Sequence, residues 1–228
     1  MKTFYSIGSI VLICMTLTLF HSCELPNKKI RASKRGSVNV LMYEIPDFDE
    51  IQINCASDVV YVAGSGAPTI TVTAKDSTSK NVIIKVVEHK LCIGIKDGTM
   101  CDSLHLEIHG TPMLEDIELH GAACMKVEGA LTPRNLDIDC NGASTIEINK
   151  VSCAELNIDC FGASFVNISN IICDDIDVDC NGAATVKLNG RSQVAKYEAN
   201  GSSTIDVSSF EAVKIEKLEN NGTSSILK

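Results

Sequence analysis

The feature that most constrains the fold of this chain is a glycine that recurs every 19 to 21 residues through the C-terminal half. The glycines are Gly121, Gly142, Gly162, Gly182, Gly201 and Gly222. An apolar residue stands four positions before each of them and another stands four positions after, and the positions next to these are mostly polar. Alternation with a period of two residues is typical of β-strands and not of helices. Each repeat is therefore predicted to contain a strand, a tight turn at the glycine and a second strand.

The nearly constant period predicts how these strands associate. Because the same apolar side recurs in every repeat, equivalent strands are expected to stack in parallel on the next coil. The sequence thus predicts an all-β fold, a parallel β-helix or β-solenoid with about 20 residues per coil, over residues 114–228. The turn glycine is expected to have a positive φ, which glycine adopts at little cost.

Residues 38–113 also resemble β-strands, but they lack this period. Apolar, strand-like segments are separated there by Gly, Asp, Ser and Pro turns, and no segment has the apolar stripe of a helix. An open solenoid end would expose apolar core and unpaired strand edges. We therefore expect an irregular all-β N-terminal cap, as either a separate domain or irregular first coils.

The N-terminus resembles an export signal. Lys2 precedes an apolar stretch from Ile7 to Phe20, which is too short to span a bilayer comfortably, and Cys23 follows a small residue as in a bacterial lipobox. The prediction is a lipoprotein signal peptide over 1–22, with acylation of Cys23 as the membrane contact; the alternative is an ordinary signal peptide and an incidental Cys23. Residues 23–37 are predicted to be a disordered tether. Its basic residues are expected to be solvated, with contact to anionic head groups as the alternative.

The charge distribution argues against a nucleic-acid partner. The formal net charge is −9, and residues 36–228 contain 14 basic and 28 acidic residues. An acidic residue stands three positions before every repeated glycine: Glu118, Asp139, Asp159, Asp179, Glu198 and Glu219. This row is interpreted as a solvated acidic face. The alternative is a Ca²⁺ site, with Asp139, Asp159 and Asp179 as candidate ligands; no other cofactor is expected.

Cysteine is abundant, with 11 residues. Cys140, Cys160 and Cys180 are spaced by 20 residues and share an inward position with Leu119 and Ala199. They are predicted to act as small core hydrophobes with stacked thiols. Disulfides and a metal site are the alternatives, although neighbouring Cβ atoms in register point in parallel rather than toward each other, and no CxxC motif occurs.

Several segments together carry a family likeness. The lipobox-like signal is followed by FDEIQINCASDVVYVAGSGAPTITVTA, then VIIKVVEHKLCIGI, then LEDIELHGAA and repeated NGAS turns. Over residues 38–228 this order resembles the putative auto-transporter adhesin family, head GIN domain, found in lipoproteins of Gram-negative bacteria. The resemblance implies a right-handed β-helix, an adhesin role and no catalytic motif.

The residues favour a binding protein over an enzyme. Sugar-cleaving β-helices need a positioned acid or base, often beside Arg or Lys, and the repeat region has only Arg134 and Arg191 as arginines. We therefore expect an exported lipoprotein, anchored at the outer membrane on its periplasmic or surface face. Its expected role is non-catalytic binding or adhesin-like binding through the β-helix surface, with a protein or glycan ligand. The alternatives are a structural envelope component without a ligand and a polysaccharide lyase or hydrolase.

One coil carries two aromatic residues where the others have polar or small ones. Phe161 immediately precedes the turn glycine and Phe165 follows it by three positions, and both positions have outward parity. Exposed aromatic residues are common anchors of interfaces. The pair is a candidate partner contact; the alternative is that both rings pack on neighbouring threonine methyl groups.

Overall fold

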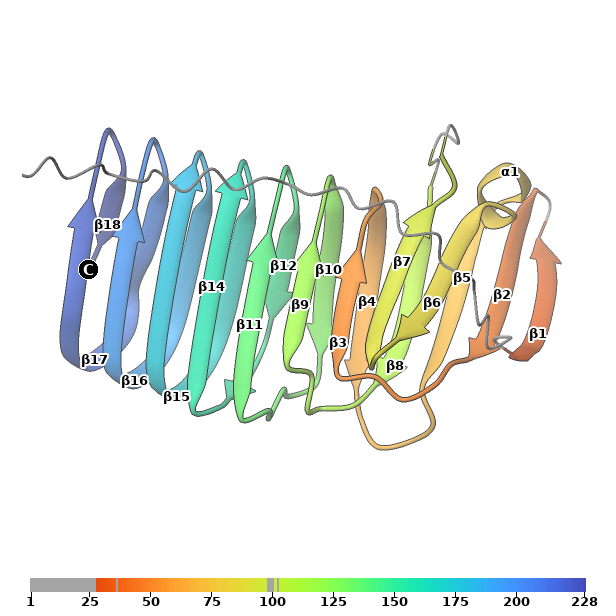
Figure 1. Ribbon diagram of the computed structural model, residues 1–228, viewed down its shortest axis with the longest axis horizontal. Coiled ribbons are helices and arrows are strands. Elements are labelled where there is room, and N and C mark those ends of the chain that lie inside the picture. Colours follow the sequence, from red (N-terminus) through yellow and green to blue (C-terminus); the bar gives the residue numbers. More distant parts are fainter. Residues whose placement is uncertain (1–27, 36, 98–100, 102) are drawn as a thin grey trace, which may run out of the picture.

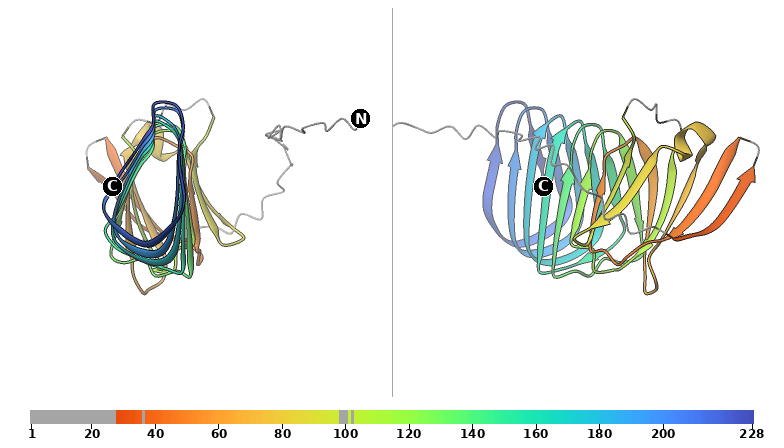
Figure 2. Two further views of the ribbon diagram at one scale, coloured as in Figure 1. Left: turned by 90° about the vertical axis from the view of Figure 1, so that its left-hand side faces the viewer. Right: turned by 45° about the vertical axis from the view of Figure 1, so that its right-hand side comes forward.

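The computed structural model describes residues 28–35, 37–97, 101 and 103–228, so the predicted signal peptide and Cys23 lie outside the described residues. The described chain forms a rod of stacked β coils (Figure 1), which confirms the predicted solenoid and its period of about 20 residues. Viewed along the rod, each coil is a flattened loop with two long sides (Figure 2).

One long side, here called the acidic side, contains strands from both halves of the chain. Its parallel strands are β7, β3, β9, β11 and β14, continued by the C-terminal halves of β15, β16 and β17, and β6 adds to β7 in antiparallel fashion. The bounds are β3 Glu50–Ile53, β6 Val82–Val87, β7 Lys90–Ile95, β9 Asp116–Leu119, β11 Asn135–Cys140, β14 Glu155–Gly162, β15 Phe165–Gly182, β16 Thr185–Ala199 and β17 Thr204–Asn220.

The other long side, here called the opposite side, has the parallel order β8, β4, β10 and β12, followed by the N-terminal halves of β15, β16 and β17 and then β18. Beyond β8, the strands β5, β2 and β1 continue this side in antiparallel order. The bounds are β1 Lys28–Arg35, β2 Val38–Glu44, β4 Ser57–Ala63, β5 Thr69–Lys75, β8 His105–Gly110, β10 Ala123–Glu128, β12 Thr145–Ile148, β13 Val151–Ser152 and β18 Ser225–Leu227. The short strand β13 lies at a corner and pairs with β15.

The N-terminal region is all-β and irregular, as predicted, and it contributes coils to the same stack. The β3–β4 coil lies between the β9–β10 coil and the β7–β8 coil, so the chain leaves the stack after β4 and returns on the outer side. One buried hydrophobic cluster extends from Ile45 to Val207. Helix α1, Asp76–Ser79, is the single helix of the described residues. The described residues contain no helix that is long and apolar enough to cross a membrane.

The prediction of a disordered tether over residues 23–37 is wrong for residues 28–35, which form β1. This strand pairs with β2 in antiparallel register, with Ala32 opposite Leu41 and Lys34 opposite Asn39. The Lys34 ammonium also forms an ion pair with Asp76 at 2.8 Å. The edge of β2 offers backbone partners that a sequence without a clear apolar period can still use, because ladder hydrogen bonds do not depend on side-chain type.

The turn glycines have the predicted conformation. Their φ values lie between 76° and 91° at all six positions. At Gly162 an added Cβ would lie 2.7 Å from the Gly142 carbonyl oxygen, because the turns of successive coils stack on one another. Glycine is therefore required at this position both for its dihedral angle and for the close approach of two backbones.

The predicted thiol ladder lies in the core. Cys140, Cys160 and Cys180 are fully buried and pair in register across three coils. The nine cysteines of the described residues carry thiols. A thiol–thiol hydrogen bond with Cys160 and burial both raise the pKa of Cys140 and of Cys180. The three side chains fill the core at the inward positions where the sequence predicted small hydrophobic residues.

Candidate functional site: an acidic groove

Outward-pointing carboxylates form two rows on the acidic side of the rod. The strands stack in register, so that Asp159 has Asp139 on one side and Asp179 on the other, and Asp137 lies beside Asp116. The first row continues to Glu118, Glu198 and Glu219, and the second contains Asp116, Asp137, Asn157 and Asp177. The period of two places these rows outside while the residues between them fill the core.

The middle of these rows lines an open groove of about 410 Å³. We call it the acidic groove; its lining residues are Asp116, Asp137, Ile138, Asp139, Asn157, Ile158, Asp159, Asp177 and Asp179. Another hollow, of about 460 Å³, lies beside Phe48 and His89, where the lining mixes apolar, histidine and acidic side chains. We take the acidic groove as the candidate site because charge of one sign is concentrated in it.

Lys90 neutralises the N-terminal end of the rows. Its ammonium contacts Glu118 at 2.6 Å and both Glu50 and Asp116 at 3.0 Å. Burial acts to lower the pKa of Lys90, but these carboxylates outweigh it and raise that pKa. Burial likewise acts to raise the pKa of Glu118, yet hydrogen bonds from Lys90 and Gln52 bring it below its usual range. The ammonium group of one lysine thus forms ion pairs with three carboxylates.

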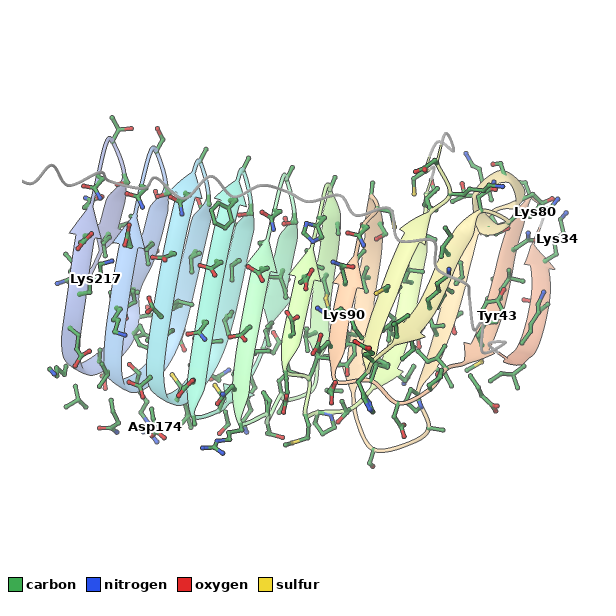
Figure 3. The ribbon with its side chains drawn as sticks, viewed as in Figure 1. Lys34, Tyr43, Lys80, Lys90, Asp174 and Lys217 are labelled. Atoms are coloured by element: carbon green, nitrogen blue, oxygen red, sulfur yellow. The ribbon has the colours of Figure 1, made fainter. Side chains whose placement is uncertain are left out.

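A pair of lysines lies at the C-terminal end of the rows. Lys217 forms ion pairs with Glu198 and, at 3.7 Å, with Glu219, while Lys196 lies 3.7 Å from Asp177. Lys90 and Lys217 are well separated along the rod, with oxygen-tipped side chains between them (Figure 3). The rows are therefore neutralised at their ends, and the central aspartates keep most of the negative charge.

The central aspartates are harder to ionise than free aspartates. Burial, followed by the charges of Asp139 and Asp179, raises the pKa of Asp159 to about 6. Burial is also the main reason that the pKa values of Asp139 and Asp179 are raised. The pKa of Asp116 is raised to about 6 by burial, in spite of the Lys90 ammonium. Near neutral pH the groove holds several carboxylates at an energetic cost.

The raised pKa of Asp159 predicts a pH-dependent gain of stability for Asp159→Asn. A carboxyl whose folded pKa lies above its unfolded value destabilises the fold above both values, and this penalty disappears as pH falls below them. We expect the variant to be more stable at pH 7 by about 1 kcal/mol, a value that allows for solvent screening of a half-buried group. The gain should shrink toward pH 4, as measured by urea unfolding at each pH.

Asp206 on β17 is the matched control for this change. Hydrogen bonds from Ser208 lower its pKa, so its carboxylate stabilises the fold near neutral pH. Asp206→Asn should therefore lose stability at pH 7, where Asp159→Asn gains it. A loss of stability in both variants, or a pH-independent gain at Asp159, would contradict the assignment of the penalty to the acidic row.

The candidate calcium ligands of the alternative interpretation, Asp139, Asp159 and Asp179, lie side by side in the first row. Across the part of the chain that the structure describes, no group of three or more His, Cys, Asp or Glu side chains is arranged to hold a metal ion. Parallel stacking explains this arrangement, because it aims successive carboxylates in one direction instead of converging them on a point. The row acts as a line of negative charge.

Phe161 adjoins the acidic groove, whereas Phe165 lies beyond the turn. Phe161 is two residues after Asp159 on β14, with the same outward parity, and its side chain is 45% exposed. Phe165 begins β15 between Thr145 and Thr185 and is half-buried. The structure therefore gives the candidate contact pair one exposed ring, next to the acidic row, and one ring that is partly covered.

The sequence did not reveal Lys90 as part of the site. The lysine lies on β7, which reaches the acidic side through β3 and not through a neighbouring repeat. Its separation from Asp116 is 26 residues and does not match the coil period. The contact between Lys90 and Asp116 depends on the position of the β3–β4 coil between β7 and β9, and no sequence pattern indicates this arrangement.

A stacked, two-sided parallel β-solenoid with one strongly acidic side is the class that the fold and site define. The family model described as putative auto-transporter adhesin, head GIN domain, matches residues 47–170, and the chain belongs to this family. No curated protein sequence matches the chain.

Several solved structures share the fold. A protein of Parabacteroides distasonis described as a putative lipid binding protein has a TM-score of 0.74 at 15% identity, covering 85% of this chain and 97% of its own. A putative adhesin of Bacteroides fragilis has a TM-score of 0.68 at 16% identity, with the same coverage. A putative adhesin of P. distasonis has a TM-score of 0.55 at 13% identity, covering 85% of this chain and 98% of its own. At these identities the likeness concerns the fold.

Proposed function

We propose that this chain is a non-catalytic binding lipoprotein of the cell envelope, held at the outer membrane through an acylated Cys23 and displayed at the cell surface. Its acidic groove binds a cationic segment of a protein partner. The observation that carries the proposal is the line of central aspartates, which the end lysines leave largely uncompensated. The family description and the adhesin names of structural neighbours agree with a binding role.

Physical chemistry supports a cationic partner. Like charges stacked at strand spacing repel one another, and burial adds to the cost of ionising Asp159. If stability were the only requirement, a neutral residue would be more favourable at this position. A Lys- or Arg-rich segment in the groove removes this repulsion and forms charge-assisted hydrogen bonds. Phe161, exposed and two residues after Asp159 on β14, adds an apolar and cation–π contact beside the groove.

A peptide and glycan array tests this proposal. The mature chain should bind peptides rich in Lys and Arg, and the triple variant Asp139→Asn, Asp159→Asn, Asp179→Asn should bind them at least about tenfold more weakly. The control carries Asp58→Asn, Glu128→Gln and Glu147→Gln, three exposed carboxylates of β4, β10 and β12 on the opposite side. It loses the same charge and should bind as the wild type does.

Four outcomes would overturn the proposal. Equal loss of binding in the two triple variants would show that only net charge matters. Binding to neutral glycans that survives the loss of all three central aspartates would place the site elsewhere. Absence of binding to every probe would favour the structural alternative, and release of reducing ends from glycans would favour an enzyme.

A further inference from the structure

The strand β1 is a strongly basic edge at one end of the rod. Five of its eight residues are Lys or Arg, and the strand contains no acidic residue. Lys29, Arg31 and Lys34 are exposed, and Lys34 is the one that pairs with Asp76 in an ion pair at 2.8 Å. The strand pairs with β2 along one of its edges. This concentration of positive charge sits on an ordered strand and not on a loose linker.

The rest of the rod carries the opposite charge. Residues 36–228 contain 14 basic and 28 acidic residues, and the acidic groove begins at β9. In Figure 1, β1 lies at one end of the rod and β17 and β18 lie at the other. The molecule is thus polarised along its length, with a basic end and an acidic body.

The basic end is also the end nearest to the predicted lipid anchor. Lys28 follows Cys23 by five residues, and five residues span at most about 18 Å. The Debye length at physiological ionic strength is about 8 Å, so charges held at such a distance sense a charged bilayer surface. The acidic body is repelled by the same surface.

We propose that β1 is a membrane-contact strand whose basic side chains bind anionic lipid headgroups of the bilayer that holds the anchor. The rod then projects from the membrane and holds its acidic groove, which lies on one long side, at a distance from the surface. This inference rests on the proposed acylation of Cys23 for its orientation. Basic residues also protect an exposed sheet edge from aggregation, and that role alone predicts no lipid preference.

Vesicle sedimentation tests the contact without the anchor. The mature chain with Cys23→Ser, which cannot be acylated, is mixed with vesicles of phosphatidylcholine alone or with about one third phosphatidylglycerol. Each basic residue near an anionic surface is expected to strengthen partitioning about fivefold. The variant Lys28→Gln, Lys29→Gln, Arg31→Gln should therefore partition about 100-fold more weakly, and high salt should abolish the wild-type preference.

The matched control removes three lysines elsewhere on the rod. Lys150, Lys187 and Lys228 are exposed, and their change to Gln should leave partitioning within about twofold. Equal partitioning of the wild-type chain into neutral and anionic vesicles would overturn the inference, and so would an equal loss in the control. Mass spectrometry of the exported protein tests acylation separately. An acylated chain without vesicle preference refutes only the contact, and a non-acylated chain with this preference refutes only the anchor.

Discussion

Replacing Gly162 with alanine is expected to lower the free energy of unfolding by about 3 kcal/mol. Two costs add at this position. The φ of +81° is strained for any residue with a Cβ, and the added carbon would lie 2.7 Å from the Gly142 carbonyl oxygen. That oxygen accepts the Ala163 amide hydrogen bond at 2.7 Å and is fixed by the stack, so it cannot move away without loss. Urea unfolding measures the change.

Gly121 provides a control with the same strain but no clash. Its φ is +80°, and an added Cβ would meet nothing within 4 Å. Gly121→Ala should therefore cost about 1 kcal/mol, the strain alone. The difference between the two variants isolates the contribution of stacked turns. Equal costs at both positions would contradict the close approach of successive coils.

The second large effect is expected at Lys90. Lys90→Gln leaves Glu50, Asp116 and Glu118 without their shared cation. These groups are only partly exposed, with 20% of the Glu118 side chain accessible, so water recovers part of the lost interaction. We expect the free energy of unfolding at pH 7 to fall by about 2 kcal/mol. The deficit should shrink as pH falls toward 4, because protonated carboxyls no longer need the lysine.

A second-site change and a control lysine make this prediction specific. Adding Asp116→Asn to Lys90→Gln removes one uncompensated carboxylate and should restore part of the stability. Lys217 also forms ion pairs with two glutamates, but its side chain is 40% exposed, so Lys217→Gln should destabilise the fold less than Lys90→Gln does. A Lys90 variant as stable as the Lys217 variant, or a deficit that grows in acid, would refute the proposed role of Lys90.

The coils after residue 114 could be predicted because each contains the same sequence pattern. An apolar period of two, a glycine with positive φ and a fixed interval together determine strand, turn and register, and they place Asp139, Asp159 and Asp179 in one outward row. The buried thiol ladder followed from the same parity. Local pattern suffices wherever each element pairs with its neighbour in sequence.

The N-terminal half depends on contacts that no local pattern encodes. The β3–β4 coil lies between segments that follow it in the chain, so its register is set by packing on both sides. The basic sequence of β1 does not have the apolar alternation of a strand, and this segment forms a strand by pairing with the edge of β2. Lys90 reaches the acidic row only because of this folding order. The row of aspartates in the acidic groove could therefore be predicted from the sequence, whereas the lysine that neutralises its N-terminal end could not.

Display at the cell surface is the claim on which a binding role depends most, and labelling of intact cells tests it directly. A membrane-impermeant amine reagent is preferable to protease here, because a stack of hydrogen-bonded coils offers few cleavable loops. We expect labelling of exposed lysines such as Lys150 and Lys187 in intact cells, with a periplasmic protein unlabelled as the control. Labelling that occurs only after the outer membrane is opened would contradict surface display and the adhesin-like role with it.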